Sequence, residues 1–136
     1  MPDYTGQKYV MEVQDNGVAQ AATDTFVVGE VRATGRVTEV TFQPEAASTG
    51  DNTNKRVYTL VNKGAAGVGT TVIATLDLVT GVDLVAFDEK AATLSVVANA
   101  TVVTEGDVLA WVSTHAATGL VDPGGVVKVT IERAAG

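Results

Sequence analysis

Apolar and polar residues alternate with a period of two along several stretches of this chain. In the clearest stretch Val127, Val129 and Ile131 fall on one face, and the residues that alternate with them, up to Glu132, are polar. Residues 72–78 show the same alternation. A strand with this pattern packs one face on a core and turns the other to solvent. Both stretches are therefore predicted to be half-buried β-strands.

Other stretches predict strands of different burial. Residues 56–61 are apolar on both faces in places, and residues 107–113 are almost continuously apolar. The second pattern predicts a central strand that is buried on both sides. Weaker candidates are residues 8–14, 25–31, 36–43, 83–87, 93–97 and 100–103. We therefore expect about eight or nine strands, roughly ten residues apart, which is typical of a sandwich or barrel.

Turn residues separate these stretches. Asp122-Pro123-Gly124-Gly125 predicts a type II turn, because proline presets the second position and glycine accepts the positive φ of the third. No segment predicts a helix longer than one turn. The expected fold is all-β, with the strands in a single sandwich or barrel domain.

The first 24 residues differ from the rest. They hold two of the three tyrosines, one candidate strand and a small-residue stretch at 17–22. We interpret residues 1–24 as an extended N-terminal arm and residues 25–136 as the sandwich domain. The alternative is that the first strand joins the sandwich. Tyrosine is enriched in interfaces, so the candidate partner-binding residues are Tyr4, Tyr9, Val10 and Met11.

Composition supports the sheet assignment and limits the partners. Apolar residues make up 46% of the 136 residues, with few aromatics and no cysteine. Much of the apolar content is valine, which favours strands over helices. The net charge of −7 disfavours nucleic-acid binding. No apolar run approaches the ~20 residues that span a bilayer, and residues 1–6 do not resemble a secretory signal, so we expect synthesis in the cytosol and no membrane partner.

Residues capable of catalysis are present, but their arrangement does not predict an enzyme. His115 is the only histidine, and Ser113 and Asp107 lie near it in sequence. Proximity along one strand does not build a triad, in which a third group must orient the base. The carboxylate pairs Asp88-Glu89 and Glu105/Asp107 are expected in turns rather than across a cleft. We predict no catalytic residue.

Metal and cofactor sites are likewise not predicted. One histidine without cysteine excludes an ordinary zinc site. Asp51, Asn52 and Asn54 lack the spacing of a calcium loop and are expected to form Asx turns. The glycines at 64, 67 and 69 are not followed by Lys-Ser or Lys-Thr, so no phosphate-binding loop is implied.

Trp111 is the only tryptophan. Its place in an apolar strand predicts a core residue. The alternative is an exposed platform for stacking a sugar ring.

Three segments carry a family resemblance: Val85-Ala86-Phe87-Asp88-Glu89-Lys90, Glu105-Gly106-Asp107-Val108-Leu109-Ala110-Trp111, and residues 118–125. Through them the chain, from about Thr34 to Glu132, resembles minor capsid, head-decoration or head-fibre proteins of tailed phages, notably those of actinobacteria. The resemblance implies a β-sandwich or jelly roll that binds the outer surface of the capsid and cements the major capsid protein lattice, often as a homotrimer. The N-terminal region would then grip the lattice, for example by strand addition.

The expected function is therefore that of a non-enzymatic virion protein on the outer capsid surface. The alternative is a glycan- or receptor-binding module of a tail fibre or baseplate. That alternative predicts an exposed Trp111, or a tyrosine beside carboxylates in a groove.

Overall fold

The computed structural model describes residues 3–135, and these residues form ten β-strands and no helix. The strands are β1 (Tyr4–Asp15), β2 (Asp24–Glu30), β3 (Gly35–Pro44), β4 (Lys55–Asn62), β5 (Thr71–Asp77), β6 (Lys90–Ala91), β7 (Thr93–Leu94), β8 (Val102–Val103), β9 (Val108–Ala116) and β10 (Gly125–Ala134). Three of them, β6, β7 and β8, are only two residues long. Within the described part of the chain no helix is long and apolar enough to cross a membrane.

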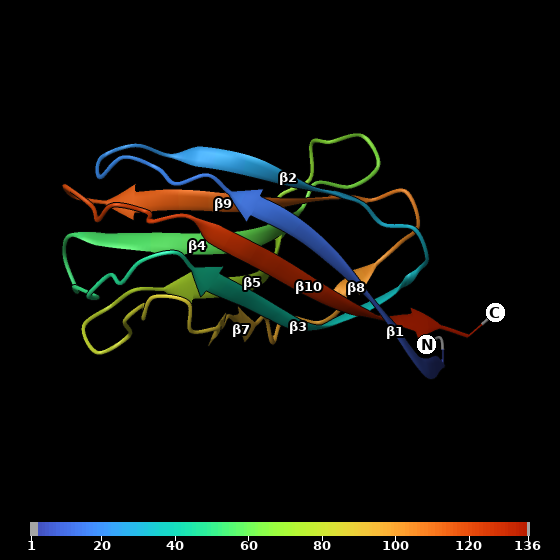
Figure 1. Ribbon diagram of the computed structural model, residues 1–136. Helices are drawn as coiled ribbons and strands as arrows, with labels where there is room; N and C mark the ends of the chain where they lie inside the picture. Colours follow the sequence, from blue (N-terminus) through green and yellow to red (C-terminus); the bar gives the residue numbers. More distant parts are fainter. Residues whose placement is uncertain (1–2, 136) are drawn as a thin grey trace.

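The strands form two antiparallel five-stranded sheets, which confirms the predicted all-β sandwich. One sheet has the order β1-β10-β3-β6, with β8 also paired to β3, and the other has the order β2-β9-β4-β5-β7. Successive long strands β1 to β4 alternate between the two sheets, so most neighbours in space are distant in sequence (Figure 1). The two ends of the described chain meet at one end of the sandwich, where the Ala135 amide donates to the Asp3 carbonyl at 2.7 Å.

The core lies between the sheets and is centred on three fully buried aromatic rings. Tyr58 and Trp111 stack with centroids 5.2 Å apart, and Phe42 packs on Tyr58 from the opposite sheet at 4.9 Å. Burying side chains of this size stabilises the fold by about 1.5–3 kcal/mol each. Trp111 is a core residue, as predicted, and its strand β9 lies between β2 and β4.

Residues 4–15 form an edge strand of the sandwich, not an arm that leaves it. β1 pairs with β10 continuously from Lys8↔Glu132 to Asp15↔Gly125. Tyr9, Met11 and Val13 point inward and pack against the core. The physical reason is visible in the alternation of residues 8–14, whose inward members share one face. Of the two alternatives for the first strand, the structure therefore has the one in which it joins the sheet; residues 1 and 2 of the expected arm, and residue 136 of the expected domain, lie outside the described residues.

The shorter candidates correspond less well to strands. The stretch 83–87 is not a strand, because Leu84 makes only an isolated bridge to Ser48 and Phe87 has a φ of 64°. A positive φ is incompatible with an extended strand. Residues 93–97 and 100–103 contribute only the two-residue strands β7 and β8. The predicted type II turn before β10 is not formed as a regular β-turn, because no backbone hydrogen bond closes it. Gly124 does have a positive φ, of 84°, and its amide donates to the Asp122 side chain at 2.9 Å, so the segment bends as an Asx turn.

Candidate partner-binding surface on strand β1

Three of the four predicted partner-binding residues line one hollow, and the fourth lies beyond it. Tyr9, Val10 and Met11 together border a hollow of about 210 Å³ between the edge strands β1 and β2. Val10 points outward and is 53% exposed. Tyr4 lies instead near the start of β1, with its ring under the Arg36 guanidinium at 4.0 Å from the centroid.

Tyr9 fastens β1 to the segment that follows β2. Its hydroxyl donates to the Ala33 carbonyl at 2.6 Å and accepts from the Ala33 amide at 3.3 Å. Burial raises the pKa of the Tyr9 phenol, against the opposing effects of the Ala33 hydrogen bond and the positive charge of Arg133. The tyrosine therefore has an inward, structural role as well as a place in the wall of the hollow.

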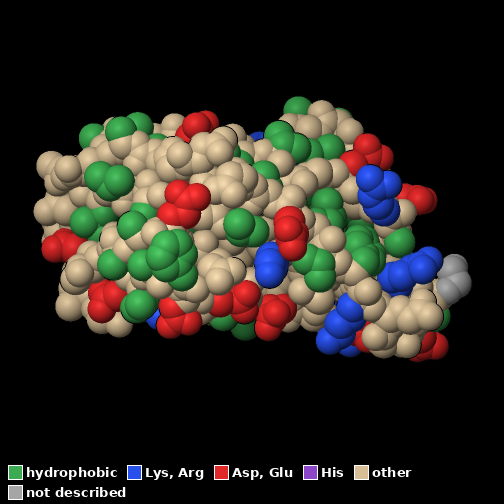
Figure 2. Space-filling view, in the orientation of Figure 1, with side chains coloured by type: hydrophobic (Ala, Val, Ile, Leu, Met, Phe, Trp, Pro, Cys, Tyr) green, Lys and Arg blue, Asp and Glu red, His purple; other side chains and the backbone are tan. Residues whose placement is uncertain are grey.

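A larger cleft of about 710 Å³ continues past Tyr9 toward the chain ends. Three of the side chains that line it are basic, namely Lys8, Arg32 and Arg133. In a chain with a net charge of −7, this is a local reversal of sign. Figure 2 shows basic side chains gathered toward the end of the molecule where the chain termini lie. Carboxylates border the region too, because Glu30 and Glu105 line the neighbouring hollow with Arg32.

None of these three basic side chains is in an ion pair with a described residue. Within residues 3–135 there are two ion pairs, Arg36–Glu132 at 2.7 Å and Lys55–Asp77 at 3.0 Å. Exposed cations without a close carboxylate are free to meet an anionic group of a partner. The cleft therefore suits an extended segment that carries acidic side chains.

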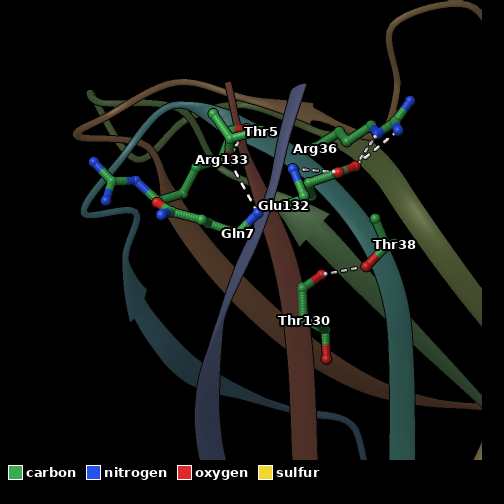
Figure 3. A network of polar contacts seen from close by, with 8 residues as sticks. Thr5, Gln7, Arg36, Thr38, Thr130, Glu132 and Arg133 are labelled. Carbon is green, nitrogen blue, oxygen red and sulfur yellow. Dashed lines mark hydrogen bonds and ion pairs between the residues drawn. The ribbon is translucent and has the colours of Figure 1, made fainter. Parts of the chain in front are cut away.

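Glu132 fixes the irregular beginning of β1 (Figure 3). One carboxylate oxygen accepts two hydrogen bonds from Arg36, at 2.9 and 2.7 Å, and the other accepts the Gly6 amide at 3.0 Å. The Arg36 hydrogen bonds hold the pKa of Glu132 below its ordinary value. Here the pairing register shifts between Tyr4 and Lys8, and the bulge at Gly6 has a φ of 78°.

The residues considered for catalysis do not converge. His115 Nδ1 lies 3.1 Å from the carbonyl of Ala117, within its own turn. Asp107 accepts hydrogen bonds from the Asn62 amide group and the Thr104 backbone amide, both at 2.9 Å, so it fixes a turn. Ser113 bonds to neither of these residues but to Asp122.

The loop considered for calcium forms the predicted turn. The Asp51 carboxylate accepts the backbone amides of Thr53 and Asn54 at 2.8 and 2.7 Å. These hydrogen bonds lower the pKa of Asp51. No group of three potential metal ligands occurs among the described residues.

A buried polar cluster at the end of the sandwich was not anticipated from the sequence. Its members come from both sheets and from the loop before β10, and they are Asp15, Arg56, Tyr58, Ser113 and Asp122, each at most 2% exposed. Asp122 accepts hydrogen bonds from the Tyr58 hydroxyl, the Ser113 hydroxyl and the Gly124 amide, all at 2.9 Å. One carboxyl group thus provides hydrogen-bond acceptors for two buried hydroxyls and a backbone amide.

Arg56 donates hydrogen bonds to carbonyl groups of the loops and not to the carboxyl groups of the cluster. Its guanidinium donates to the carbonyls of Ala19, Gln20, Ala22 and Leu120 at 2.7–3.1 Å. It thereby joins the connection between β1 and β2 to the connection between β9 and β10. A buried arginine of this kind is stabilising only because its donors are satisfied.

Asp15 lies beside Asp122 in the same cluster. Burial, followed by the hydrogen bond and the negative charge of Asp122, raises the pKa of Asp15 from 3.8 to about 8. At neutral pH Asp15 therefore keeps its proton, and the neutral carboxyl group avoids the cost of burying a charge. Burial and Asp122 also raise the pKa of the Tyr58 phenol.

The sequence carried only a faint signal for this cluster. Asp15 ends the apolar alternation of β1, and Asp122 begins the Asp-Pro-Gly-Gly turn. Each has an ordinary local explanation, and only the strand order brings them together. With the geometry described, comparison of the chain with protein-family models, curated proteins and solved structures found no match.

Proposed function

We propose that this chain is a non-enzymatic structural protein of a phage virion that binds the outer surface of the capsid. Its partner would be the lattice of the major capsid protein, which it would stabilise as a homotrimer. The resemblance carried by residues 85–90, 105–111 and 118–125 motivates the choice of a capsid.

The strand order is consistent with this role. The orders of the sheets' first four strands, β1-β10-β3-β6 and β2-β9-β4-β5, support a jelly roll, because two Greek keys that wrap together give such orders; the two-residue strands β7 and β8 are additional. Jelly rolls are found in viral capsid domains and in lectins. Fold alone does not assign function. The surface must supply the rest.

The observation that carries the proposal is the edge strand β1. It presents Tyr9, Val10 and Met11 in one hollow along the side of the sandwich, and β1 is a terminal strand of its sheet. An unpaired strand edge accepts an extended segment through main-chain hydrogen bonds, while neighbouring side chains give specificity. Such a surface suits attachment to another protein.

The test is co-sedimentation of the purified chain with undecorated capsids of an actinobacterial tailed phage, in expanded and unexpanded forms. We expect saturable binding to expanded shells alone. Deleting residues 1–24 is unsuitable as a variant, since it would remove β1 and the buried Asp15. The double substitution Arg32→Glu with Arg133→Glu is preferable, because both side chains are exposed in the cleft.

This double variant should weaken shell binding, whereas Lys63→Glu, in the loop after β4, should not. Absence of binding to either shell by the folded wild-type protein would overturn the proposal. Equal binding by the double variant would leave capsid binding standing and remove the cleft from it.

A glycan-binding role is the second candidate, and one observation favours it. Tyr9 lines its hollow together with Glu12 and Glu30, and a tyrosine beside carboxylates is a common way to hold a sugar. Trp111 does not contribute, because it is fully buried. Glycan-array binding that is lost in the double variant Glu12→Gln with Glu30→Gln, whose side chains are exposed in the hollow, would favour this role over capsid binding.

A further inference from the structure

Strand β1 has a long free edge. It is the terminal strand of its sheet, and β10 is its only ladder partner among the described residues. From Lys8 to Asp15 the pairing with β10 is regular. The opposite side of β1 therefore presents main-chain donors and acceptors to solvent, which is a template for another strand.

The outward face of this edge has a symmetric charge pattern. Lys8, Val10 and Glu12 alternate with inward residues and are all exposed. Val10, at 53% exposure, stands midway between a cation and an anion. Charged residues on an edge strand ordinarily oppose pairing with another strand. Here the two opposite charges lie at equal distances from a central apolar residue. When two copies of this strand pair antiparallel about that residue, each cation therefore lies opposite an anion.

We propose that two copies of this chain associate through their β1 strands, antiparallel, about a twofold axis at Val10. In this register Val10 meets Val10 of the second copy. Lys8 lies opposite Glu12 of the second copy, and Glu12 lies opposite its Lys8. The contact is isologous, as a twofold interface must be, and each opposite-charge cross-strand pair is favourable.

The neighbouring strand continues the same charge order. Within one copy Lys8 is opposite Glu132 and Glu12 is opposite Lys128 on β10, and Glu132 is paired with Arg36. A row across the joint would then read Arg36, Glu132, Lys8, followed by Glu12 and Lys128 of the second copy. The charges alternate in sign over all five positions, so every cation lies between anions or at the end of the row.

Other registers lack this complementarity. In-register parallel pairing would set Lys8 against Lys8 of the second copy, and a slip of one residue would turn the inward face of one strand outward. On the inward face, the Val10-centred register places Tyr9 opposite Met11 of the second copy, a favourable aromatic–thioether contact. Charge and packing therefore select the same register.

This dimer and the proposed capsid contact use the same edge of β1. The two contacts therefore exclude each other, and a copy that binds a shell through β1 would first have to leave the dimer. It concerns the free protein in solution.

The test uses two charge reversals and their mixture, followed by sedimentation equilibrium. Lys8→Glu alone sets two carboxylates against each other in both cross-strand pairs, and Glu12→Lys alone sets two ammonium groups against each other. Each single variant should raise the dimer Kd roughly tenfold or more. Mixing the two variants restores both opposite-charge pairs, and the mixture should form a heterodimer with a Kd within a few-fold of wild type.

The mixture is its own control for folding, because neither variant changes when the other is added. Lys63→Glu and Glu39→Lys change the net charge by the same amounts on other parts of the surface, and both should dimerise as wild type does. A wild-type protein that stays monomeric up to millimolar concentration would overturn the inference. So would single variants that dimerise normally, or a mixture that does not associate.

A second measurement locates the axis. The chain has no cysteine, so Val10→Cys introduces a single thiol. Opposed residues in an antiparallel pair have Cα atoms about 4.5–5.5 Å apart, within the range that a disulfide bridges. Mild oxidation should cross-link Val10→Cys into dimers at least tenfold faster than Val68→Cys, which replaces a side chain that is 80% exposed in the loop after β4. Equal rates for the two variants would contradict an axis at Val10.

Discussion

The Asp15 carboxyl group, at the end of β1, accepts a hydrogen bond from Trp111 Nε1 in the opposite sheet at 3.3 Å. This contact crosses the sandwich and joins the edge strand to the centre of the core. The second oxygen of Asp15 accepts the Gly17 amide at 2.9 Å and shapes the turn that follows. The end of β1 is thus fixed from within, while its outer edge stays open.

The free energy of unfolding should fall as the pH rises from 3.8 toward about 8, the ordinary and the folded-state pKa of Asp15. The folded protein holds the Asp15 proton up to about pH 8, whereas an unfolded chain releases it near 3.8. The stabilising effect of the bound proton is therefore complete below the unfolded pKa and is lost as the pH rises toward 8, by at most about 1.4 kcal/mol per pH unit.

Urea denaturation at about pH 5.5 and about pH 8.5 measures this effect. The wild type should be less stable at the higher pH, and Asp15→Asn, which mimics the protonated carboxyl group, should lose most of the difference. The carboxylates of Glu132 and Asp51 have lowered pKa values, so they titrate below this range. An Asp15→Asn variant with the same pH dependence as the wild type would contradict the assignment.

Replacing Arg56 should be strongly destabilising. Arg56→Met keeps most of the side-chain volume but leaves the carbonyls of Ala19, Ala22 and Leu120 without their buried donor. Removing one member of a buried charged cluster costs about 3–5 kcal/mol. Chemical denaturation would show the loss as a lower midpoint.

Lys55→Met is the matched control for Arg56→Met. Lys55 is the preceding residue of β4, and its partly exposed pair with Asp77 should contribute no more than about 1 kcal/mol. If the two variants lost similar stability, the buried cluster would not have the role described here.

The protein should be more stable with glycine at position 87 than with phenylalanine. Its φ is 64° and its side chain is 72% exposed, so it has backbone strain without compensating burial. A non-glycine residue in the left-handed region costs about 1–2 kcal/mol. Phe87→Gly should therefore raise the melting temperature, as measured by circular dichroism.

Val85→Gly provides the comparison for Phe87. Val85 is similarly exposed in the same loop, and it is not among the residues of positive φ. Its replacement by glycine should lower stability slightly, because glycine increases the freedom of the unfolded chain. Two changes of the same sign would show that strain at Phe87 is not the cause.

Trp111 should report a buried environment in fluorescence. Its side chain is fully buried and its indole NH is bonded to Asp15. Emission should be blue-shifted relative to the unfolded chain and resistant to iodide. Red-shifted, readily quenched emission in the folded protein would contradict the position of Trp111.

The sequence predicted the sheets better than their connections. Alternation located the strands around Val127 and Leu76 because one face of each is buried in the core. It failed at residues 83–87, where Phe87 is of a type common in strands but takes the third position of a turn that the Asp88 amide closes on the Val85 carbonyl at 3.0 Å. The local pattern of apolar residues does not reveal a positive φ.

The candidate partner-binding residues lie close together in the sequence, but their side chains point in different directions in the structure. Met11 and Tyr9 face inward, and Val10 faces outward. Arg32 and Arg133 could not be associated with them from sequence, because their positions in the cleft depend on β1 and β10 being neighbours. The same limit hid the Asp15–Asp122 cluster, whose members come together only through the strand order.

We propose that β1 and the cleft beside it would contact the capsid. Amide hydrogen exchange measures this directly when dilute free protein is compared with protein bound to expanded shells. We predict slower exchange in residues 4–15 and 28–33 on the shell, with β5 unchanged. Unchanged exchange in β1, or slowing confined to residues 84–97 where Val85, Phe87, Val96 and Val97 are exposed, would contradict it.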